Sequence, residues 1–290
     1  MSVRLLRGVG EIAGAYDGLI LDLWGVVHDG NRPYPGVLDA LERLARAGKP
    51  VVLLSNAPRR VGAIAQRLSE IGIPAAFYAG IHSSGEEVWQ RLKRRDTPFY
   101  AALGRRCCFI GPTRDEGMTE GLDVVRAETP EDADFLLNTG PWGWDETTEK
   151  YEPILAAARA RDLPMVCANA DLTVIHRGRR IICAGALALR YEDMGGRVSW
   201  HGKPFPSVYE ASLGLLGMSD RRRVLAVGDS LRTDIAGART AGIDAVWIVG
   251  GLHAEELGIV PGTLPDRERI AAALAATGEA PLAVAPGFSW

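Results

Sequence analysis

The sequence has few of the features that would mark a membrane or nucleic-acid-binding protein. No apolar run approaches the roughly 18 residues that a helix needs to cross a bilayer. Glu11 and Asp17 interrupt the N-terminal stretch in which a signal peptide would need an apolar core. The formal net charge is −3 and the pI is about 6.0, which gives no electrostatic reason to expect nucleic acid. We therefore expect a cytoplasmic protein that binds neither membrane nor nucleic acid.

Cysteine is also scarce. The four cysteines are Cys107, Cys108, Cys167 and Cys183, and no two of them have the C-x-x-C spacing. A zinc or redox motif of that kind is therefore absent from the sequence, and we expect buried, reduced thiols.

The 290 residues that are present are 47% hydrophobic, enough to bury a substantial core in two domains. Short β-rich runs alternate with helical patterns, which is typical of parallel strands joined by crossover helices. The predicted strands cover residues 19–23, 50–54, 106–110, 134–138, 165–168, 224–227 and 245–249. The predicted helices cover residues 37–44, 61–71, 86–93, 148–161, 184–194, 206–216, 234–240 and 266–276. This order predicts an α/β fold with a mainly parallel sheet.

The Ala- and Pro-rich tail from Glu279 onward has no strong pattern of its own. We expect it to be loosely attached unless Phe288 and Trp290 pin it to a surface.

Polar residues follow several of the predicted strands. Asp22 ends the first strand within L-I-L-D-L-W-G-V-V-H-D-G, Ser55 and Asn56 follow the second, and Asp229 follows a later one. Lys203 lies in His-Gly-Lys-Pro, just before a predicted helix. Open α/β sheets bind ligands beyond the carboxyl ends of their strands, so these residues are expected to converge on one crevice.

Phosphoryl transfer is the chemistry that uses such a set. A carboxylate such as Asp22 can form an aspartyl phosphate and divide a difficult hydrolysis into two easier steps. Magnesium held by Asp22 and Asp229 would reduce the repulsion between two anions. Ser55 could donate a hydrogen bond, and Lys203 a positive charge, to the oxygens of the transferred group.

The sequence resembles the haloacid dehalogenase superfamily, whose four motifs occur in order. They are Asp22-Leu-Trp24-Gly, Leu-Ser55-Asn56, Lys203-Pro and Gly-Asp229-Ser-Leu-Arg-Thr-Asp234. Asn169-Ala-Asp171 and Arg177-Gly178 are similar to the subgroup with a large α/β cap, which includes nucleotide, sugar-phosphate, phosphoglycolate and aryl-phosphate phosphatases. The resemblance implies a Rossmann-like three-layer core from residues 1–98 and 198–290, and an inserted α/β cap at 99–197 that sets specificity.

The resemblance also implies roles for individual residues. Asp22 would be the nucleophile and a Mg²⁺ ligand, with the backbone carbonyl of Trp24 and the side chain of Asp229 as further ligands. Asp234 would bind metal-coordinated water or orient its loop.

The same resemblance implies a substrate-binding set. Ser55 and Lys203 would hold the phosphoryl group of a small phosphorylated metabolite, and Asn56 would support the Ser55 loop. In the cap, Asn169 and Asp171 would contact the substrate.

Trp24 departs from the family pattern, because most phosphatases of this superfamily have a second Asp there as general acid and base. Three interpretations remain open. The first is a phosphatase restricted to acidic leaving groups such as acyl or aryl phosphates, and the second is a phosphate-ligand binding or regulatory protein without turnover. The third keeps catalysis, with cleavage of carbon–phosphorus or carbon–halogen bonds, or with His28 or Asp29 replacing the missing acid.

The predicted cap holds further candidates that could face the crevice. Asn138, Trp142 and Trp144 follow or lie near a predicted strand, and the tryptophans could stack on a flat substrate. Packing anchors or an oligomer contact are the alternative for the tryptophans. Caps of this kind commonly mediate dimerisation, so a homodimer through the cap is a further expectation. The sequence does not identify the substrate.

Overall fold

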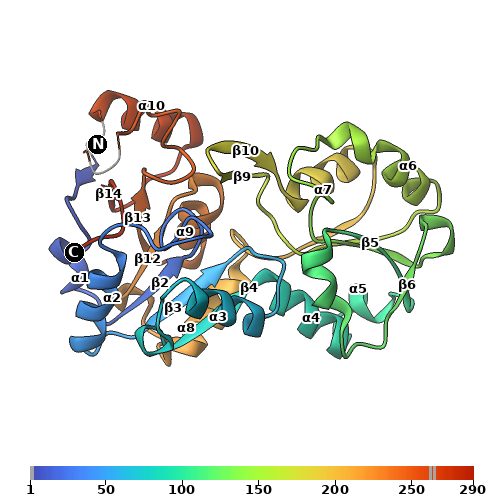
Figure 1. Cartoon of the computed structure of the whole chain (residues 1–290), viewed down its shortest axis with the longest axis horizontal. Helices are drawn as coiled ribbons and strands as arrows, with labels where there is room; N and C mark the ends of the chain where they lie inside the picture. Colours follow the sequence, from blue (N-terminus) through green and yellow to red (C-terminus); the bar gives the residue numbers. More distant parts are fainter. Residues whose placement is uncertain (1–2, 261–262, 264–265) are drawn as a thin grey trace. The chain divides into compact units, whose positions relative to one another are not determined.

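The computed structural model describes residues 3–260, 263 and 266–290 of the chain (Figure 1). The strands are β1 (Arg4–Leu5), β2 (Gly18–Asp22), β3 (Val51–Ser55), β4 (Gly80–Ser83), β5 (Arg106–Ile110), β6 (Val125–Ala127), β7 (Phe135–Asn138), β8 (Met165–Cys167), β9 (Thr173–His176), β10 (Arg179–Ile182), β11 (Val198–Trp200), β12 (Val224–Gly228), β13 (Asp244–Ile248) and β14 (Ala283–Ala285). The helices are α1 (Gly10–Ala13), α2 (Val37–Arg46), α3 (Val61–Glu70), α4 (Ser84–Arg94), α5 (Pro98–Ala101), α6 (Glu152–Ala160), α7 (Ala184–Asp193), α8 (Pro206–Leu216), α9 (Ala236–Ala241) and α10 (Arg267–Thr277). Among the described residues, none of these helices is both long and apolar enough to cross a membrane.

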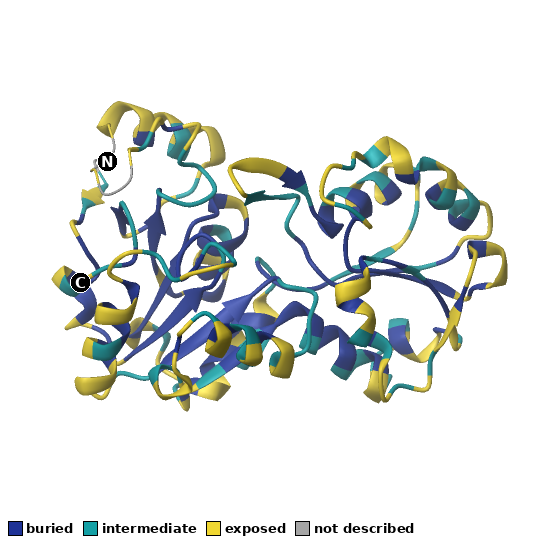
Figure 2. Cartoon of the chain, viewed as in Figure 1, coloured by how far each residue is buried: buried dark blue, intermediate teal, exposed yellow. Residues whose placement is uncertain are grey.

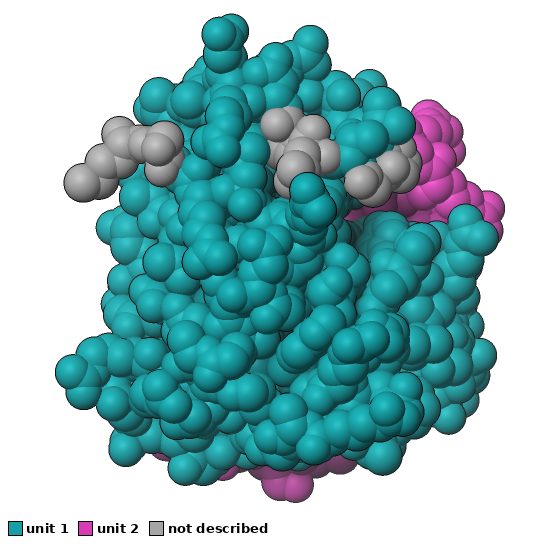
Figure 3. All heavy atoms as spheres, turned by 90° about the vertical axis from the view of Figure 1, so that its left-hand side faces the viewer, with its two compact units in different colours: residues 1–55, 64–82, 203–290 teal, residues 56–63, 83–202 magenta. Residues whose placement is uncertain are grey.

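The chain divides into two compact units, which Figure 3 colours separately. The first unit consists of residues 1–55, 64–82 and 203–290, and the second of residues 56–63 and 83–202. Each unit contains a parallel sheet of its own.

The sheet of the first unit has the strand order β1-β14-β13-β12-β2-β3-β4. From β14 to β3, neighbouring strands are parallel. Along the chain, β3 and β4 are added on one side of β2, whereas β12, β13 and β14 extend from its other side. The strand order therefore reverses between β2 and β12, and this reversal is the topological switch point of the first sheet.

The central strands of the first sheet are buried along their whole length, as expected for a parallel sheet covered on both faces (Figure 2). Helices α8 and α9 cover one face, where Val208 and Leu213 of α8 join a cluster with Ile20, Val52 and other strand residues. Burial of such aliphatic side chains contributes roughly 1.5–3 kcal/mol each.

The sheet of the second unit has the order β11-β8-β7-β5-β6, and its neighbouring strands are parallel. Alternating side chains build its two covered faces. Cys107 and Phe135 pack with residues of α4 and α5, while Cys108 and Leu136 pack with residues of α6 and α7. This strand order reverses between β5 and β7, so the second sheet has a switch point of its own. Strands β9 and β10 form a separate antiparallel hairpin.

The predicted α/β class with mainly parallel sheets is confirmed, but three regions differ from expectation. The second compact unit comprises residues 56–63 and 83–202, whereas the cap was expected at 99–197. Val88 and Leu92 of α4 pack on the second sheet. The tail is not loose: β14 pairs with β13 and β1, and Phe288 is buried. The predicted helix at 148–161 is a 3₁₀ turn followed by α6.

Candidate active site

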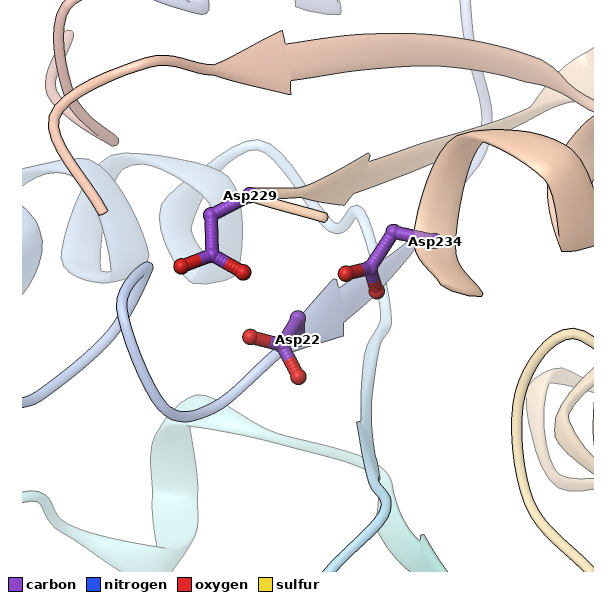
Figure 4. A group of neighbouring side chains, drawn as sticks. All are labelled: Asp22, Asp229 and Asp234. Carbon is purple, nitrogen blue, oxygen red and sulfur yellow. The ribbon is translucent and has the colours of Figure 1, made fainter. Parts of the chain in front are cut away.

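The switch point of the first sheet is lined by carboxylates. Asp22 is the last residue of β2, and Asp229 directly follows the neighbouring strand β12. Asp234 belongs to a π-helical turn, Leu231–Ile235, that comes next in the chain. All three are buried, and each offers a ligand oxygen within 4.8 Å of the others (Figure 4). The structure therefore brings together three carboxylates that the sequence motifs only placed far apart in the chain.

Lys203 supplies a positive charge to this cluster. Its Nζ donates hydrogen bonds to Oδ1 of Asp22 at 2.5 Å and to Oδ1 of Asp234 at 2.7 Å. The Lys203 side chain is only 3% exposed. A buried, charge-assisted contact of this kind fixes both carboxylates relative to the ammonium group.

Asp229 carries the clearest electrostatic signature of the site. Burial, and then the charges of Asp22 and Asp234, raise its pKa well above the usual value. The Leu252 N–H donates to its Oδ2 at 2.7 Å. The backbone of Gly25 also approaches closely, since a Cβ at that position would lie 1.9 Å from Oδ2.

These residues fit a divalent cation. One ammonium group cannot neutralise three ionised carboxylates, so the cluster favours either protonation of a carboxyl group or binding of a cation. Carboxylate oxygens are ligands that hard cations such as Mg²⁺ prefer. Asp22, Asp229 and Asp234 are the residues in the described part of the chain whose geometry could hold such an ion.

Ser55 also lies at this edge. It is the buried last residue of β3, and the preceding residue, Leu54, pairs with Asp22 across the two parallel strands. The carboxyl ends of β2 and β3 thus place Ser55 and Asp22 on neighbouring strands, as the sequence predicted.

Trp24 belongs to a tight loop that follows β2. The N–H groups of Val27 and His28 both donate to the carbonyl of Leu23. The indole ring meets the His28 ring edge-on, with centroids 5.8 Å apart. Gly30 makes room for the indole: a Cβ there would lie 2.5 Å from it, and Gly30 has φ +91°. Trp24 is therefore built into the loop.

His28 is neutral at physiological pH. Burial, the largest cause, lowers the pKa of its imidazole to about 4. Its Nδ1 accepts the Gly30 N–H at 2.9 Å, which assigns the ring proton to Nε2. A neutral imidazole in this tautomer is a poor proton donor.

Asp29 stabilises a turn in the same loop. Its Oδ1 accepts the N–H groups of Asn31 and Arg32 at 2.8 and 2.9 Å. Desolvation raises the pKa of Asp29, but these hydrogen bonds, together with the charges of Arg32 and His28, lower the pKa overall. Asp29 is thus held ionised as a turn residue.

The remaining sequence candidates lie in the second unit. Asn56 Nδ2 donates to Oδ1 of Asp171 at 2.9 Å, and the Asp171 N–H donates to Oδ1 of Asn169 at 2.8 Å. Asn138, at the end of β7, donates to the carbonyl of Ala184 at 2.9 Å. The structure therefore brings Asn56, Asn169 and Asp171 together.

The two cap tryptophans have aromatic partners. Trp142 packs on Tyr151 with centroids 4.6 Å apart, and Trp144 stacks on His176 at 4.1 Å and 7°. These contacts support the packing interpretation, although both tryptophans remain more than 40% exposed.

Sequence reasoning did not single out Arg59, Arg114 and Asp115. Asp115 is a buried carboxylate paired with Nε of Arg59 at 3.0 Å. The partners are 56 residues apart. The one local signal is the pair of arginines that follows Ser55 and Asn56.

Comparison with known proteins places the chain among its relatives. Residues 19–124 match the model of the haloacid dehalogenase-like hydrolases, and residues 200–276 match a second, HAD-hydrolase-like model. Human chronophin (Homo sapiens) is 30% identical over 256 residues, which cover 85% of this chain and 86% of chronophin. Ribonucleotide monophosphatase NagD of Escherichia coli strain K12 is 27% identical over 241 residues, which cover 81% of this chain and 88% of NagD.

A solved structure is also similar over nearly the whole chain. It is a haloacid dehalogenase-like hydrolase from Brucella suis 1330, with a TM-score of 0.82 and 32% identity over 98% of this chain and 100% of that one. The carboxylates and Lys203 described above occupy the motif positions from which the sequence resemblance was drawn. The chain belongs to the haloacid dehalogenase-like hydrolase family.

Proposed function

We propose that this protein is a Mg²⁺-dependent phosphatase of a small phosphorylated metabolite, with Asp22 as the nucleophile. The observation that carries the proposal is the buried cluster of Asp22, Asp229 and Asp234 around Lys203 at the switch point of the first sheet. A relative with similar coverage is named a ribonucleotide monophosphatase, which supports the same reaction class.

In the proposed reaction, a carboxylate oxygen of Asp22 attacks the phosphorus atom as the bond to the leaving-group oxygen breaks. Lys203 stabilises the charge of the transferring group, and Ser55 holds one of its oxygens. Water then attacks the aspartyl phosphate, the bond between Asp22 and phosphorus breaks, and orthophosphate departs. Asp22, Asp229 and the Trp24 carbonyl would hold Mg²⁺, which reduces repulsion between the anions. Asp234 would fix Lys203 and its own loop.

Trp24 restricts this reaction in our proposal. An indole neither donates a proton to a leaving oxygen nor takes one from water, and such help is worth about 10²–10⁴-fold. Neutral His28 and the turn residue Asp29 are poor replacements. We therefore propose a preference for acyl and aryl phosphates, whose leaving groups depart without a proton.

The test is Mg²⁺-dependent phosphate release from acetyl phosphate, p-nitrophenyl phosphate, a sugar phosphate and a nucleotide. The wild type is compared with Asp22→Asn and with Trp24→Asp. Release that Asp22→Asn abolishes is expected, with acyl and aryl substrates fastest. Trp24→Asp is expected to raise alkyl phosphate turnover, by up to about 10²-fold. Release that survives in Asp22→Asn would refute the proposal.

Trp24 also favours a second candidate, a protein that binds a phosphorylated ligand without turnover. Thermal stabilisation by phosphate esters with no release from any of the four substrates would support this candidate. Residence in the cytoplasm and a homodimer through the second unit remain predictions, which fractionation and sedimentation would test.

A further inference from the structure

The second sheet has a binding edge that neither the motifs nor the relatives assign. Its strand order reverses between β5 and β7, and open α/β sheets bind ligands beyond the carboxyl ends of strands at such a reversal. The loop after β5 carries Arg114 and Asp115. We propose that Arg59 and Arg114 form an oxyanion-binding site at this edge.

Arg114 is held in place while its hydrogen-bond donors stay available. Its guanidinium carbon lies 4.1 Å from the centroid of the Trp144 ring, and Trp144 stacks in turn on His176. Stacking fixes the plane of a guanidinium group and leaves its N–H edges free. Within the described ranges, the Arg114 side chain donates no hydrogen bond and forms no ion pair.

Arg59 is also preorganised with donors to spare. Its Nε donates to Oδ1 of Asp115 at 3.0 Å, and Ser83 Oγ donates to the carbonyl of Arg59 at 2.6 Å. Its two terminal amino groups have no hydrogen-bond partner among the described residues. The Arg59 side chain is 34% exposed, whereas that of Asp115 is 2% exposed. The buried carboxylate of Asp115 therefore fixes the orientation of the partly exposed Arg59 guanidinium group.

The charges at this edge leave a positive excess. Arg59 pairs with Asp115, and Arg114 is the residue next to Asp115 in the chain. Desolvation lowers the pKa of Arg114 most, the charge of Asp115 raises it, and the charge of Arg59 lowers it by a smaller effect. Repulsion between like charges is relieved when an anion binds between them. An ammonium ion, a metal ion or an apolar ligand has no comparable reason to bind here.

The class of ligand follows from the donors. The planar fork of a guanidinium matches the oxygens of a carboxylate or a phosphoryl group, to which it can donate two parallel hydrogen bonds. Such a group could belong to the substrate of the proposed phosphatase or to a separate anionic metabolite. The site itself does not depend on phosphatase activity.

Binding is tested first, with malonate as the probe and the full chain in metal-free buffer, by isothermal titration calorimetry. Arg114→Gln is expected to weaken binding about tenfold or more, because it removes charge-assisted hydrogen bonds. Arg114→Lys keeps the charge but not the fork, so an intermediate affinity is expected. Arg105→Gln, an exposed arginine at the opposite end of β5, is the matched control and is expected to bind like the wild type. Equal affinity in wild type and Arg114→Gln, or no binding by the wild type at about 10 mM malonate, would overturn the site.

Kinetics then distinguish the two sources of the anion. Phosphoglycolate and its neutral amide carry the phosphoryl group on similar alcohols and differ in the second anionic group. If the site binds the substrate, Arg114→Gln raises KM for phosphoglycolate only, and malonate competes with it. If the site binds a separate metabolite, both substrates respond alike and malonate is not competitive. Absence of phosphate release from every substrate would count against the proposed phosphatase, while the malonate titration would still decide the oxyanion site.

Discussion

The carboxyl edges of the two sheets carry opposite excess charge. Three buried carboxylates lie with one ammonium group, which contacts two of them, at the edge of the first sheet. At the edge of the second sheet, the guanidinium group of Arg59 pairs with one buried carboxylate, and Arg114 adds a second positive charge in the residue next to that carboxylate. Both edges lie where the strand order reverses. The comparison teaches that topology selects the place where a ligand can bind, and that a few side chains select the charge of the ligand.

The largest expected effect tests the chemistry of the first edge. Asp22→Asn should lower phosphate release by about 10⁴-fold, because an amide is no nucleophile. The amide oxygen can still accept from Lys203, so thermal stability should change little. Asp39→Asn, on the exposed side of α2, is the control and should keep full activity. Loss of activity together with a large loss of stability would mean that Asp22 has a structural role. The carboxylates of the first edge could then not be assigned to catalysis by this variant.

Removal of the ammonium group tests the charge balance of the first edge. Lys203→Met should lower the free energy of unfolding of the metal-free protein by about 3–5 kcal/mol, since buried carboxylates lose their partner. Addition of Mg²⁺ should recover part of that loss. Urea unfolding measures both, with exposed Lys150→Met as the control, for which a change below about 1 kcal/mol is expected. A Lys203→Met protein as stable as the wild type would show that the three carboxyl groups are not all ionised at the same time.

The pH dependence of stability sharpens the description of the first edge. The pKa of His28 is about 4 in the folded protein, against about 6.5 in an unfolded chain. The unfolded chain therefore takes up a proton between these values and the folded protein does not. Stability from neutral His28 is present above pH 6.5 and is lost as the pH falls towards 4, by about 3 kcal/mol.

His28→Asn removes this titration and keeps an acceptor for the Gly30 N–H. The difference in unfolding free energy between wild type and variant should therefore shift by about 3 kcal/mol in favour of the variant from pH 7 to pH 4. His253→Asn, at a half-buried position, is the matched substitution. A constant difference across that range would show that His28 is not desolvated.

The smallest effect is expected at the second edge. Arg59→Met leaves the buried Asp115 carboxylate without its closest cation, at a cost of about 1–3 kcal/mol. The cost should be below that of Lys203→Met, because Arg59 is one-third exposed and water can replace it. Parallel urea titrations of the two variants measure both losses of unfolding free energy. A larger loss for Arg59→Met than for Lys203→Met would contradict the prediction.

Much of the first edge could be predicted from sequence, because several of its site residues stand next to the apolar runs that form the strands. The apolar runs of β2 and β3 end in the polar residues Asp22 and Ser55, and Asp229 directly follows β12, so the strands and the residues at their carboxyl ends were predictable together. The strands that were missed have two to four residues, and so short a run shows no clear hydrophobic period. They include β1, β4, β6, β9, β10 and β14.

The second edge was not predictable for a different reason. Arg59 and Asp115 are 56 residues apart, with α4 and β5 between them, and the pair of arginines after Asn56 was the one local signal. The packing of α4 was equally unpredictable, since its apolar face could pack on either sheet and only tertiary contacts place Val88 and Leu92 on the second. The place of Trp24 over Gly30 likewise depends on a turn that the sequence suggested without its geometry.

The second unit includes the short segment 56–63 in addition to residues 83–202, and this has a consequence for protein engineering. A chimaera that exchanged only residues 83–202 with those of a relative would keep Asn56 and Arg59 but lose Asp171 and Asp115, with which they pair. In such a hybrid, the native segment 56–63 would face side chains of the relative in place of its own hydrogen-bond partners. An exchange of the second unit between relatives would therefore have to include the eight-residue segment 56–63 together with residues 83–202.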